Sequence, residues 1–437
     1  MIYNTFLEKL ILPIGDLLNR STYIKQLKYW REIDGYSEEK LNSLEKENLK
    51  NLILFSNKNC SLYKEIELKG NNPYDWLSQF PVLTKDQLRS HPEALLTNST
   101  INLIKYSSSG STGLQTSVYM NKKEQANIRA ILTHWWEWSG YKIGSPLIQT
   151  GITPNRGLLK RIKDLLFKTI YISAFSHTEQ QLSAICKRIN TSSNYFLAGY
   201  ASSLNVIAEY ALANNFTIKF KSVISLGDKL FSNYKTTIEE AFSCKVYDTY
   251  GCNEGFLIAS QKDLEYKYIM SPHVYLEILD DNNQPVPDGQ LGHVVVTRLD
   301  GYSMPLIRYK IGDLAIKLPK EKYPINREFY YPLLEKIIGR ETDIVHLPNG
   351  KKMVVHSFTG IFEYIPEIKQ FQVIQETQNE ITIKYIKGHS FTTAALKKAT
   401  IELQKHIQDI SFKIVYEEVN TILPSKSGKP QIIESKL

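Results

Sequence analysis

A short segment rich in glycine and hydroxyl side chains has the composition of a phosphate-binding loop. It lies between the apolar runs INLI and SVYM and consists of Ser108, Ser109, Gly110, Ser111, Thr112 and Gly113. Glycines leave backbone N–H groups accessible and the hydroxyls add donors, so the segment can surround several phosphate oxygens without bulky side chains. Because it lacks the Gly-Lys-Ser/Thr ending of a Walker loop, it predicts a phosphate loop of another kind. A flexible loop with no ligand is the alternative.

A second segment combines an aromatic ring with carboxylates at the end of an expected strand, KVYDTYG. It contains Asp248, Tyr250, Gly251, Asn253 and Glu254. Ligands of α/β sheets commonly bind at the carboxyl ends of strands. A tyrosine can stack on a purine, and a carboxylate is a suitable oxygen ligand for Mg²⁺. The segment predicts a nucleotide-binding strand end with Glu254 as metal ligand, and an ordinary turn with a surface glutamate is the alternative.

Three further segments place single charged residues where they could bind ribose or phosphate. Asp313 follows a glycine and precedes an apolar run, a position from which a carboxylate can accept hydrogen bonds from both ribose hydroxyls. Arg340 offers a planar fork of donors, and Lys429 lies in a Ser-Gly-Lys turn that would project an ammonium group. Taken alone, each has a plain structural alternative: a buried or capping aspartate, a linker salt bridge and a solvated tail.

An α/β framework with two units must bring these segments together. Residues 1–95 are expected to be mainly helical, KSVISLG at 221–227 predicts a buried strand ending in a glycine turn, and residues 272–318 are typical of β-strands. After IIGRETDIV the sequence predicts a compact αβ unit. We therefore expect an α/β fold with a large multi-layered N-terminal domain at 1–339 and a small α+β C-terminal domain at 340–437.

Composition excludes several classes of protein. The chain has 42% hydrophobic and 22% charged residues, which is ordinary for a globular protein. Its net charge of +8 includes no run of five like charges, so no nucleic-acid partner is expected. The mild basic excess suits a polyanionic ligand such as ATP or coenzyme A, with general solubility as the alternative. The four cysteines form no CxxC pair, which excludes a zinc knuckle and fits a reducing cytoplasm.

The N-terminal segment FLEKLILPIGDLL is apolar but interrupted by charged residues and proline. It does not resemble a signal peptide, and no stretch reaches the roughly 18 apolar residues that a membrane span needs. We therefore expect no transmembrane segment and a cytoplasmic protein. The segment is expected to pack on the protein's own core, and an amphipathic segment lying on a membrane surface is the alternative.

Together and in this order, the five segments resemble the adenylate-forming superfamily of acyl-CoA synthetases, luciferases and peptide-synthetase adenylation domains. Within it the chain is similar to the phenylacetate-CoA ligase group, and most similar to the CapK-like branch found in capsular and surface polysaccharide gene clusters. MPLIRYKIGDLA, GYASSLNVIAEYA and the N-terminal RSTYIKQLKYW carry the narrower resemblance. The resemblance covers nearly the whole chain.

The resemblance implies where the nucleotide would lie. The loop from Ser108 to Gly113 would close over the β- and γ-phosphates of ATP. Gly227, Asp228 and Lys229 match the segment that flanks adenine, with Tyr250 stacking nearby.

The resemblance also implies the catalytic groups. Glu254 would hold Mg²⁺, Asp313 would accept the ribose hydroxyls, and Arg340 would reach the ribose or phosphate side. Lys429 would contact the reacting carboxylate and the α-phosphate. No general base is needed, since a carboxylate is already ionised at neutral pH.

Several positions depart from the family pattern. Asn253 replaces the usual threonine, and its amide can still donate to the α-phosphate. Gln115 and Thr116 stand where many relatives have Pro-Lys, so one phosphate cation is absent. Thr342 replaces a common hinge aspartate, which leaves the hinge residue open. Only His273 remains of a Cys/His cluster found in some relatives, so a zinc site is not expected.

Both the acid and the acceptor stay open at this stage. Trp135, Trp136, Trp138, Tyr200 and Phe256 could line an apolar acid pocket, and core packing is the alternative. After rotation of the small domain, coenzyme A would accept the acyl group. An amino group of a sugar or amino acid is a second candidate acceptor, and a non-catalytic nucleotide-binding relative is a third interpretation. A homodimer is left open.

Overall fold

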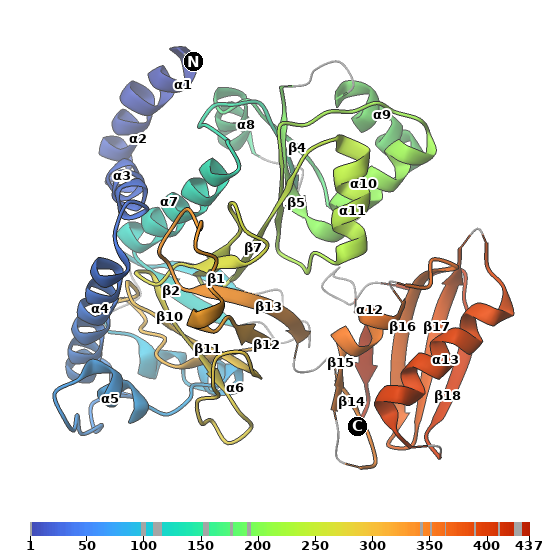
Figure 1. Cartoon of the computed structure of the whole chain (residues 1–437). Helices are drawn as coiled ribbons and strands as arrows, with labels where there is room; N and C mark the ends of the chain where they lie inside the picture. Colours follow the sequence, from blue (N-terminus) through green and yellow to red (C-terminus); the bar gives the residue numbers. More distant parts are fainter. Residues whose placement is uncertain are drawn as a thin grey trace.

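The computed structural model divides the chain into a large and a small unit (Figure 1). The described residues are 2–97, 102–107, 116–151, 157–174, 178–189, 194–340, 344–349, 352–362, 364–388, 390–409, 411–423 and 431–437. The expected phosphate loop at Ser108 to Gly113, the expected hinge beyond Arg340 and Lys429 therefore lie outside the described residues. Among the described residues, no helix is both long and apolar enough to cross a bilayer.

Helices make up the N-terminal part of the large unit. They are α1 (Ile2–Phe6), the π-helical η1 (Leu7–Ile11), α2 (Leu12–Asn19), α3 (Tyr23–Ile33), α4 (Glu38–Asn59), α5 (Pro73–Ser78), α6 (Lys85–Ser90), the short 3₁₀ turn η2 (Pro92–Leu95) and, after a hairpin, α7 (Lys122–Trp138). Ser37 accepts a hydrogen bond from the Lys40 N–H and so caps α4, while Thr84 and Gln87 form a capping box on α6. Such caps satisfy N–H groups that the first helical turn leaves without partners.

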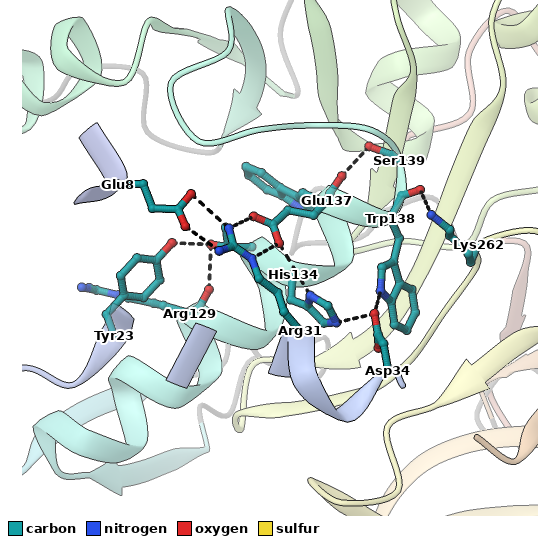
Figure 2. Close-up of polar contacts among 12 residues, drawn as sticks. Glu8, Tyr23, Arg31, Asp34, Arg129, His134, Glu137, Trp138, Ser139 and Lys262 are labelled. Carbon is teal, nitrogen blue, oxygen red and sulfur yellow. Dashed lines mark hydrogen bonds and ion pairs between the residues drawn. The ribbon is translucent and has the colours of Figure 1, made fainter. Parts of the chain in front are cut away.

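Buried polar contacts attach η1 and α3 to α7 (Figure 2). The Arg31 guanidinium bridges Glu8 and Glu137, with N–O distances of 2.5 Å to each carboxylate. On α7, His134 Nε2 lies 3.0 Å from Asp34 Oδ2, and His134 Nδ1 lies 3.6 Å from Glu137 Oε2. Burial opposes protonation of His134, but these two carboxylates raise its pKa above the ordinary value. One face of the N-terminal segment therefore packs on the protein's own core.

One sheet of eleven strands runs through the large unit in the order β10-β11-β12-β13-β9-β8-β7-β6-β5-β3-β4. The parallel part comprises β3 (Leu147–Gly151), β4 (Thr169–Ser173), β5 (Phe196–Tyr200), β6 (Val223–Leu226) and β7 (Val246–Cys252). The antiparallel part comprises β8 (Phe256–Ser260), β9 (Lys267–Ile269), β10 (Val274–Leu279), β11 (Leu291–Arg298), β12 (Tyr309–Lys317) and β13 (Leu333–Arg340), with a 3₁₀ turn η4 (Lys320–Lys322) before β13. Strand β7 joins the two parts, because it is parallel to β6 and antiparallel to β8. The predicted strand at 221–227 is β6.

Helices cover the parallel part of the sheet. They are α8 (Leu158–Leu166), α9 (Glu179–Ile189), α10 (Ala201–Ala213) and α11 (Ser232–Phe242). The apolar faces of α9, α10 and α11 form a buried cluster with the strands that includes Leu204, Phe242 and Val246. A separate hairpin of β1 (Ile104–Ser107) and β2 (Ser117–Met120) encloses the expected phosphate loop. The backbone pairing of this hairpin extends to Ser107 and Ser117.

The small unit follows β13. It contains β14 (Ile344–His346), β15 (Lys352–Val354), α12 (Val355–Phe362), β16 (Ile368–Thr377), β17 (Glu380–Lys387), α13 (Thr393–Ile407), β18 (Lys413–Glu418) and β19 (Ile433–Ser435). Four strands form a sheet in the order β18-β17-β16-β19, and α13 buries Ala399 and Leu403 in a core of the unit's own. The predicted α/β fold with a large sheet and a small C-terminal unit is confirmed. The expected boundary falls at the last residue of β13, and its role as a hinge stays a prediction.

Candidate active site

Three of the predicted ligand-binding residues meet across β7, β12 and β13. The hydroxyl of Tyr250 donates a hydrogen bond of 2.9 Å to Asp313 Oδ2, and Arg340 Nε lies 3.8 Å from Asp313 Oδ1. The strand register explains the second contact, because Asp313 and Arg340 are directly paired across β12 and β13. Burial and the charge of Asp313 raise the pKa of Tyr250 well above its usual range, so the phenol stays protonated and donates. The arrangement holds the Asp313 carboxylate and the Arg340 guanidinium side by side where β13 ends.

Glu254 lies in the turn between β7 and β8. Its side chain is buried, and Oε1 accepts a hydrogen bond of 3.2 Å from the Tyr309 hydroxyl. Burial and the neighbouring Glu254 carboxylate raise the pKa of the Cys252 thiol well above its usual range, so Cys252 also presents a proton to this site. Among the described residues, no lysine or arginine forms an ion pair with Glu254. The carboxylate is therefore held by neutral donors.

The β7–β8 turn is too tight for a side chain at Gly251. A Cβ there would lie 2.4 Å from the Phe256 carbonyl oxygen, which is backbone and cannot move aside. The tight turn keeps Glu254 inward while Asn253 stays exposed at the rim. Its amide is accessible to a ligand, as its predicted role requires.

The segment predicted to flank adenine follows β6. Gly227 has φ +83°, and a Cβ there would meet the ring of Tyr200 at 2.5 Å, so only glycine fits. Asp228 caps α10, accepting from the Ala201 N–H and the Ser202 hydroxyl at 2.5 Å each. Lys229 donates to the carbonyl oxygen of Ile338 at 2.6 Å and so links this segment to β13. The side chains of Asp228 and Lys229 are engaged within the protein, which leaves the backbone to face a ligand.

Asp248 is held by contacts within the sheet. Its Oδ2 lies 2.8 Å from Lys267 Nζ, and its backbone N–H donates to the Gln261 side chain at 3.1 Å. Both partners sit on the antiparallel side of β7. The geometry favours a structural role for Asp248, while its predicted contact with the nucleotide stays a prediction.

Comparisons with known proteins agree with this geometry. Residues 345–436 match the family model described as the CapK C-terminal domain. Protein CapK of Staphylococcus aureus is 26% identical over 436 residues, covering 95% of this chain and 93% of its own. A phenylacetate-coenzyme A ligase of Thermus thermophilus is 23% identical over 79% of this chain and 80% of its own. The chain is a homologue of CapK and of the phenylacetate-coenzyme A ligases.

Solved structures identify the fold. The crystal structure of 2-hydroxyisobutyryl-CoA ligase in the postadenylation state, with R3-HIB-AMP bound, superposes with a TM-score of 0.73 at 18% identity, over 93% of this chain and 91% of that one. The same enzyme in the thioesterification state gives a TM-score of 0.57 at 19% identity, over 93% and 92%. The chain therefore has the fold of 2-hydroxyisobutyryl-CoA ligase, in agreement with its sequence similarity to CapK and to the phenylacetate-coenzyme A ligases.

The aromatic residues predicted to line an acid pocket lie in different surroundings. Trp135 is buried in the core between α7 and the N-terminal helices, and Phe256 stacks on Tyr309 with ring centroids 5.9 Å apart. Trp136 is half-buried against the ring of Tyr141. Tyr200 is half-buried at the carboxyl end of β5 beside Gly227. Trp138 is buried in the same core as Trp135. Of the five, Tyr200 lies next to the expected nucleotide segment, and an acid-binding role for the set stays a prediction.

Sequence reasoning missed Arg89 on α6. Its Nε donates a hydrogen bond of 3.1 Å to the Thr116 hydroxyl, one residue beyond the part of the loop that is not described. Burial and Glu254 raise the pKa of Tyr309, and the positive charge of Arg89 acts against that shift. The substitution at Thr116 was a signal that a cation had to come from elsewhere. Nothing in the local sequence KDQLRS pointed to Arg89.

The residues around Glu254 fit a magnesium ion. Mg²⁺ in nucleotide sites is usually bound by one or two carboxylates, with substrate phosphates and water completing the shell. A single buried carboxylate beside two neutral donors meets that requirement. No group of three or more metal-ligating side chains occurs among the described residues, so a metal site formed by side chains alone is not present in that part of the chain.

Proposed function

We propose that this protein is an AMP-forming ligase that activates a carboxylic acid with ATP and transfers the acyl group to coenzyme A. The observation that carries the proposal is the Tyr250–Asp313–Arg340 contact beside the buried Glu254. A carboxylate next to a guanidinium suits the hydroxyls of ribose and the adjacent phosphate. The solved relatives of this fold are described with acyl-AMP and with coenzyme A bound, which supports the same ligand classes here.

In the first step, a carboxylate oxygen of the acid forms a bond to the α-phosphorus and the bond to pyrophosphate breaks. Two anions must approach, so catalysis requires positive charge and donors fixed in advance. Asp313 would position the ribose, Arg340 would face the phosphate side, and Asn253 would donate to the α-phosphate. Mg²⁺ held by Glu254 would neutralise charge on the departing pyrophosphate.

In the second step, the sulfur of coenzyme A forms a bond to the acyl carbon and AMP leaves. The names of the phenylacetate-coenzyme A ligase relatives support coenzyme A as acceptor. CapK is similar to nearly the whole chain, but its name indicates no acceptor. An amine acceptor would give an amide in place of a thioester, so the product distinguishes the two.

The test is acid-dependent ATP–pyrophosphate exchange across aryl, short-acyl, long-acyl and amino acids, followed by mass spectrometry of products formed with coenzyme A. Exchange that requires one acid class would establish adenylation and define that class. A thioester product would establish the acceptor. Nucleotide binding without exchange for any acid would contradict the proposal and favour a non-catalytic relative.

A further inference from the structure

The N-terminal helices expose a continuous apolar stripe. Ile2, Phe6, Leu10, Ile14 and Leu17 recur at spacings of four, four, four and three residues, and all are exposed. A spacing of four drifts around an ordinary α-helix, but the wider π-helical turn at η1 compensates part of that drift. The five side chains therefore follow one side of the helical rod from α1 to α2.

The opposite side of this rod is fixed to the protein. Leu7 is fully buried and packs directly on Gly144, where a Cβ would lie 2.4 Å from it. Asn4 Nδ2 donates to the Ile143 carbonyl at 2.8 Å, and Glu8 pairs with Arg31. Figure 2 shows Glu8 pointing inward to that guanidinium. Because these contacts fix the rotation of the rod, the apolar stripe is directed away from the core.

Helix α8 adds a second exposed apolar face beside the first. Leu158, Ile162 and Leu165 follow the i, i+4, i+7 pattern of one helical face and are exposed, Leu165 by 80%. The Tyr3 hydroxyl donates to the carbonyl oxygen of Leu166 at 2.6 Å, which joins α1 to the end of α8. Figure 1 shows both elements at the end of the molecule remote from the small unit. The stripe and this face together form one surface, here termed the α1–α8 surface.

The α1–α8 surface exposes more large apolar side chains than other parts of the described surface. Together α1, η1, α2 and α8 hold nine of the twenty exposed large apolar side chains among the described residues. Single exposed apolar residues need no explanation, but a contiguous group marks a surface that something covers.

Positive charge accompanies these apolar residues. Residues 157–170 contain four basic residues, Lys160, Arg161, Lys163 and Lys168, against the single acidic Asp164. All four basic side chains are exposed, and Lys168 Nζ lies 4.1 Å from the centre of the Tyr3 ring, at the join between α1 and α8. Long cationic side chains can lie along an apolar face and place their charge at its edge. An apolar face edged by cations is complementary to an anionic lipid surface.

We propose that the α1–α8 surface binds an anionic phospholipid bilayer and places the enzyme on the membrane. A second copy of the chain is the less suitable occupant, because a twofold contact would bring the same basic residues against each other. The apolar side chains of this surface would insert as far as the boundary between the lipid headgroups and the acyl chains. The inference is independent of which acid or acceptor the enzyme uses.

The experiment is sedimentation of the full chain with phosphatidylcholine vesicles and with vesicles of phosphatidylcholine and phosphatidylglycerol. We expect binding to the anionic vesicles only, weakened when the salt is raised from about 0.05 to 0.5 M. Leu165→Glu should lower vesicle partitioning about tenfold or more, because it removes apolar burial and adds repulsion. The matched control is Ile401→Glu, the same type of change at a helical residue of the small unit that is 59% exposed.

Each outcome decides the proposal. Loss of binding in Leu165→Glu, retention in Ile401→Glu and equal thermal unfolding midpoints for both variants would support it. Absence of wild-type binding to anionic vesicles, or equal loss in both variants, would overturn it. A concentration-dependent dimer in the absence of vesicles that Leu165→Glu abolishes would assign the surface to a second copy instead.

Discussion

At the scale of single residues, two of the carboxylates in the candidate site have different partners. Asp313 accepts from Tyr250 and lies beside Arg340, the last residue of β13. Asp248 is paired with Lys267 within the sheet. The first carboxylate has groups around it that a ribose and a phosphate can use, and the second has its charge compensated by the protein.

The two carboxylates are expected to differ in catalysis. Asp313→Asn should lower kcat/KM for ATP in pyrophosphate exchange by about 10²-fold, since an amide disturbs both the Tyr250 and Arg340 contacts. Asp248→Asn should leave the KM for ATP unchanged and lower the thermal unfolding midpoint, because Lys267 loses its partner. Equal kinetic losses in the two variants would show that Asp248 also contacts the nucleotide.

Arg89 is expected to supply the positive charge that Thr116 lacks. Arg89→Gln should raise the KM for ATP by about tenfold, because a charged donor is lost beside the expected phosphate loop. Arg89→Lys should recover part of that loss, since it restores the charge without the guanidinium geometry. Asp86→Asn serves as the control, because it removes the exposed partner of Arg89 without changing Arg89 itself. An unchanged KM in Arg89→Gln would exclude the role.

At the scale of elements, one buried histidine links the N-terminal helices to α7. His134 is raised in pKa by Asp34 and Glu137, so its charged form stabilises the folded state. A raised pKa contributes stability that is fully present below the unfolded value of about 6.5 and is lost as pH rises through the folded value. The pKa of Glu137 is lowered although burial opposes the shift, so its contribution is lost only at acidic pH.

The packing of α3 on α7 should therefore weaken above neutrality. We expect the free energy of unfolding of the wild type to fall as the pH rises above about 6.5, a slope that His134→Gln should flatten. At pH 6 the same substitution should cost about 1–3 kcal/mol, because both carboxylates lose a buried partner. His406→Gln, at an exposed position of α13, is the matched control. Denaturant unfolding at several pH values measures the effect, and parallel slopes for wild type and His134→Gln would contradict it.

At the scale of the whole molecule, the sequence predicted the two-unit α/β fold because periodicity reports local structure. Strand β6 and the compact C-terminal unit followed from apolar runs alone. The pairing of Asp313 with Arg340 could not be predicted, because the β12–β13 ladder contains register shifts near Leu314. Trp135 and Phe256 are buried in hydrophobic cores. The sequence could not show this, because an aromatic residue type occurs both in a core and in the lining of a pocket. Arg89 precedes Thr116 by 27 residues, and only the tertiary fold brings the two side chains together.

The expected hinge begins just after Arg340, the last residue of β13. The bond from Lys229 to the Ile338 carbonyl holds the adenine-flanking segment against β13, two residues before Arg340. A rotation of the small unit would therefore begin just beyond β13, which this hydrogen bond holds in place.

We predict that Lys429 acts in only one of the two half-reactions. Lys429→Ala should slow acid-dependent pyrophosphate exchange by about 10²–10³-fold, because one preorganised cation at the reacting carboxylate is lost. The same variant should convert a supplied acyl-AMP and coenzyme A to thioester at nearly the wild-type rate, since the small unit would have rotated and withdrawn the lysine. Lys436→Ala, just beyond β19 and paired with the exposed Glu376, is the control for general damage to the unit. Equal losses in both half-reactions would mean that the unit does not alternate between two arrangements, and that Lys429 acts in a single fixed site.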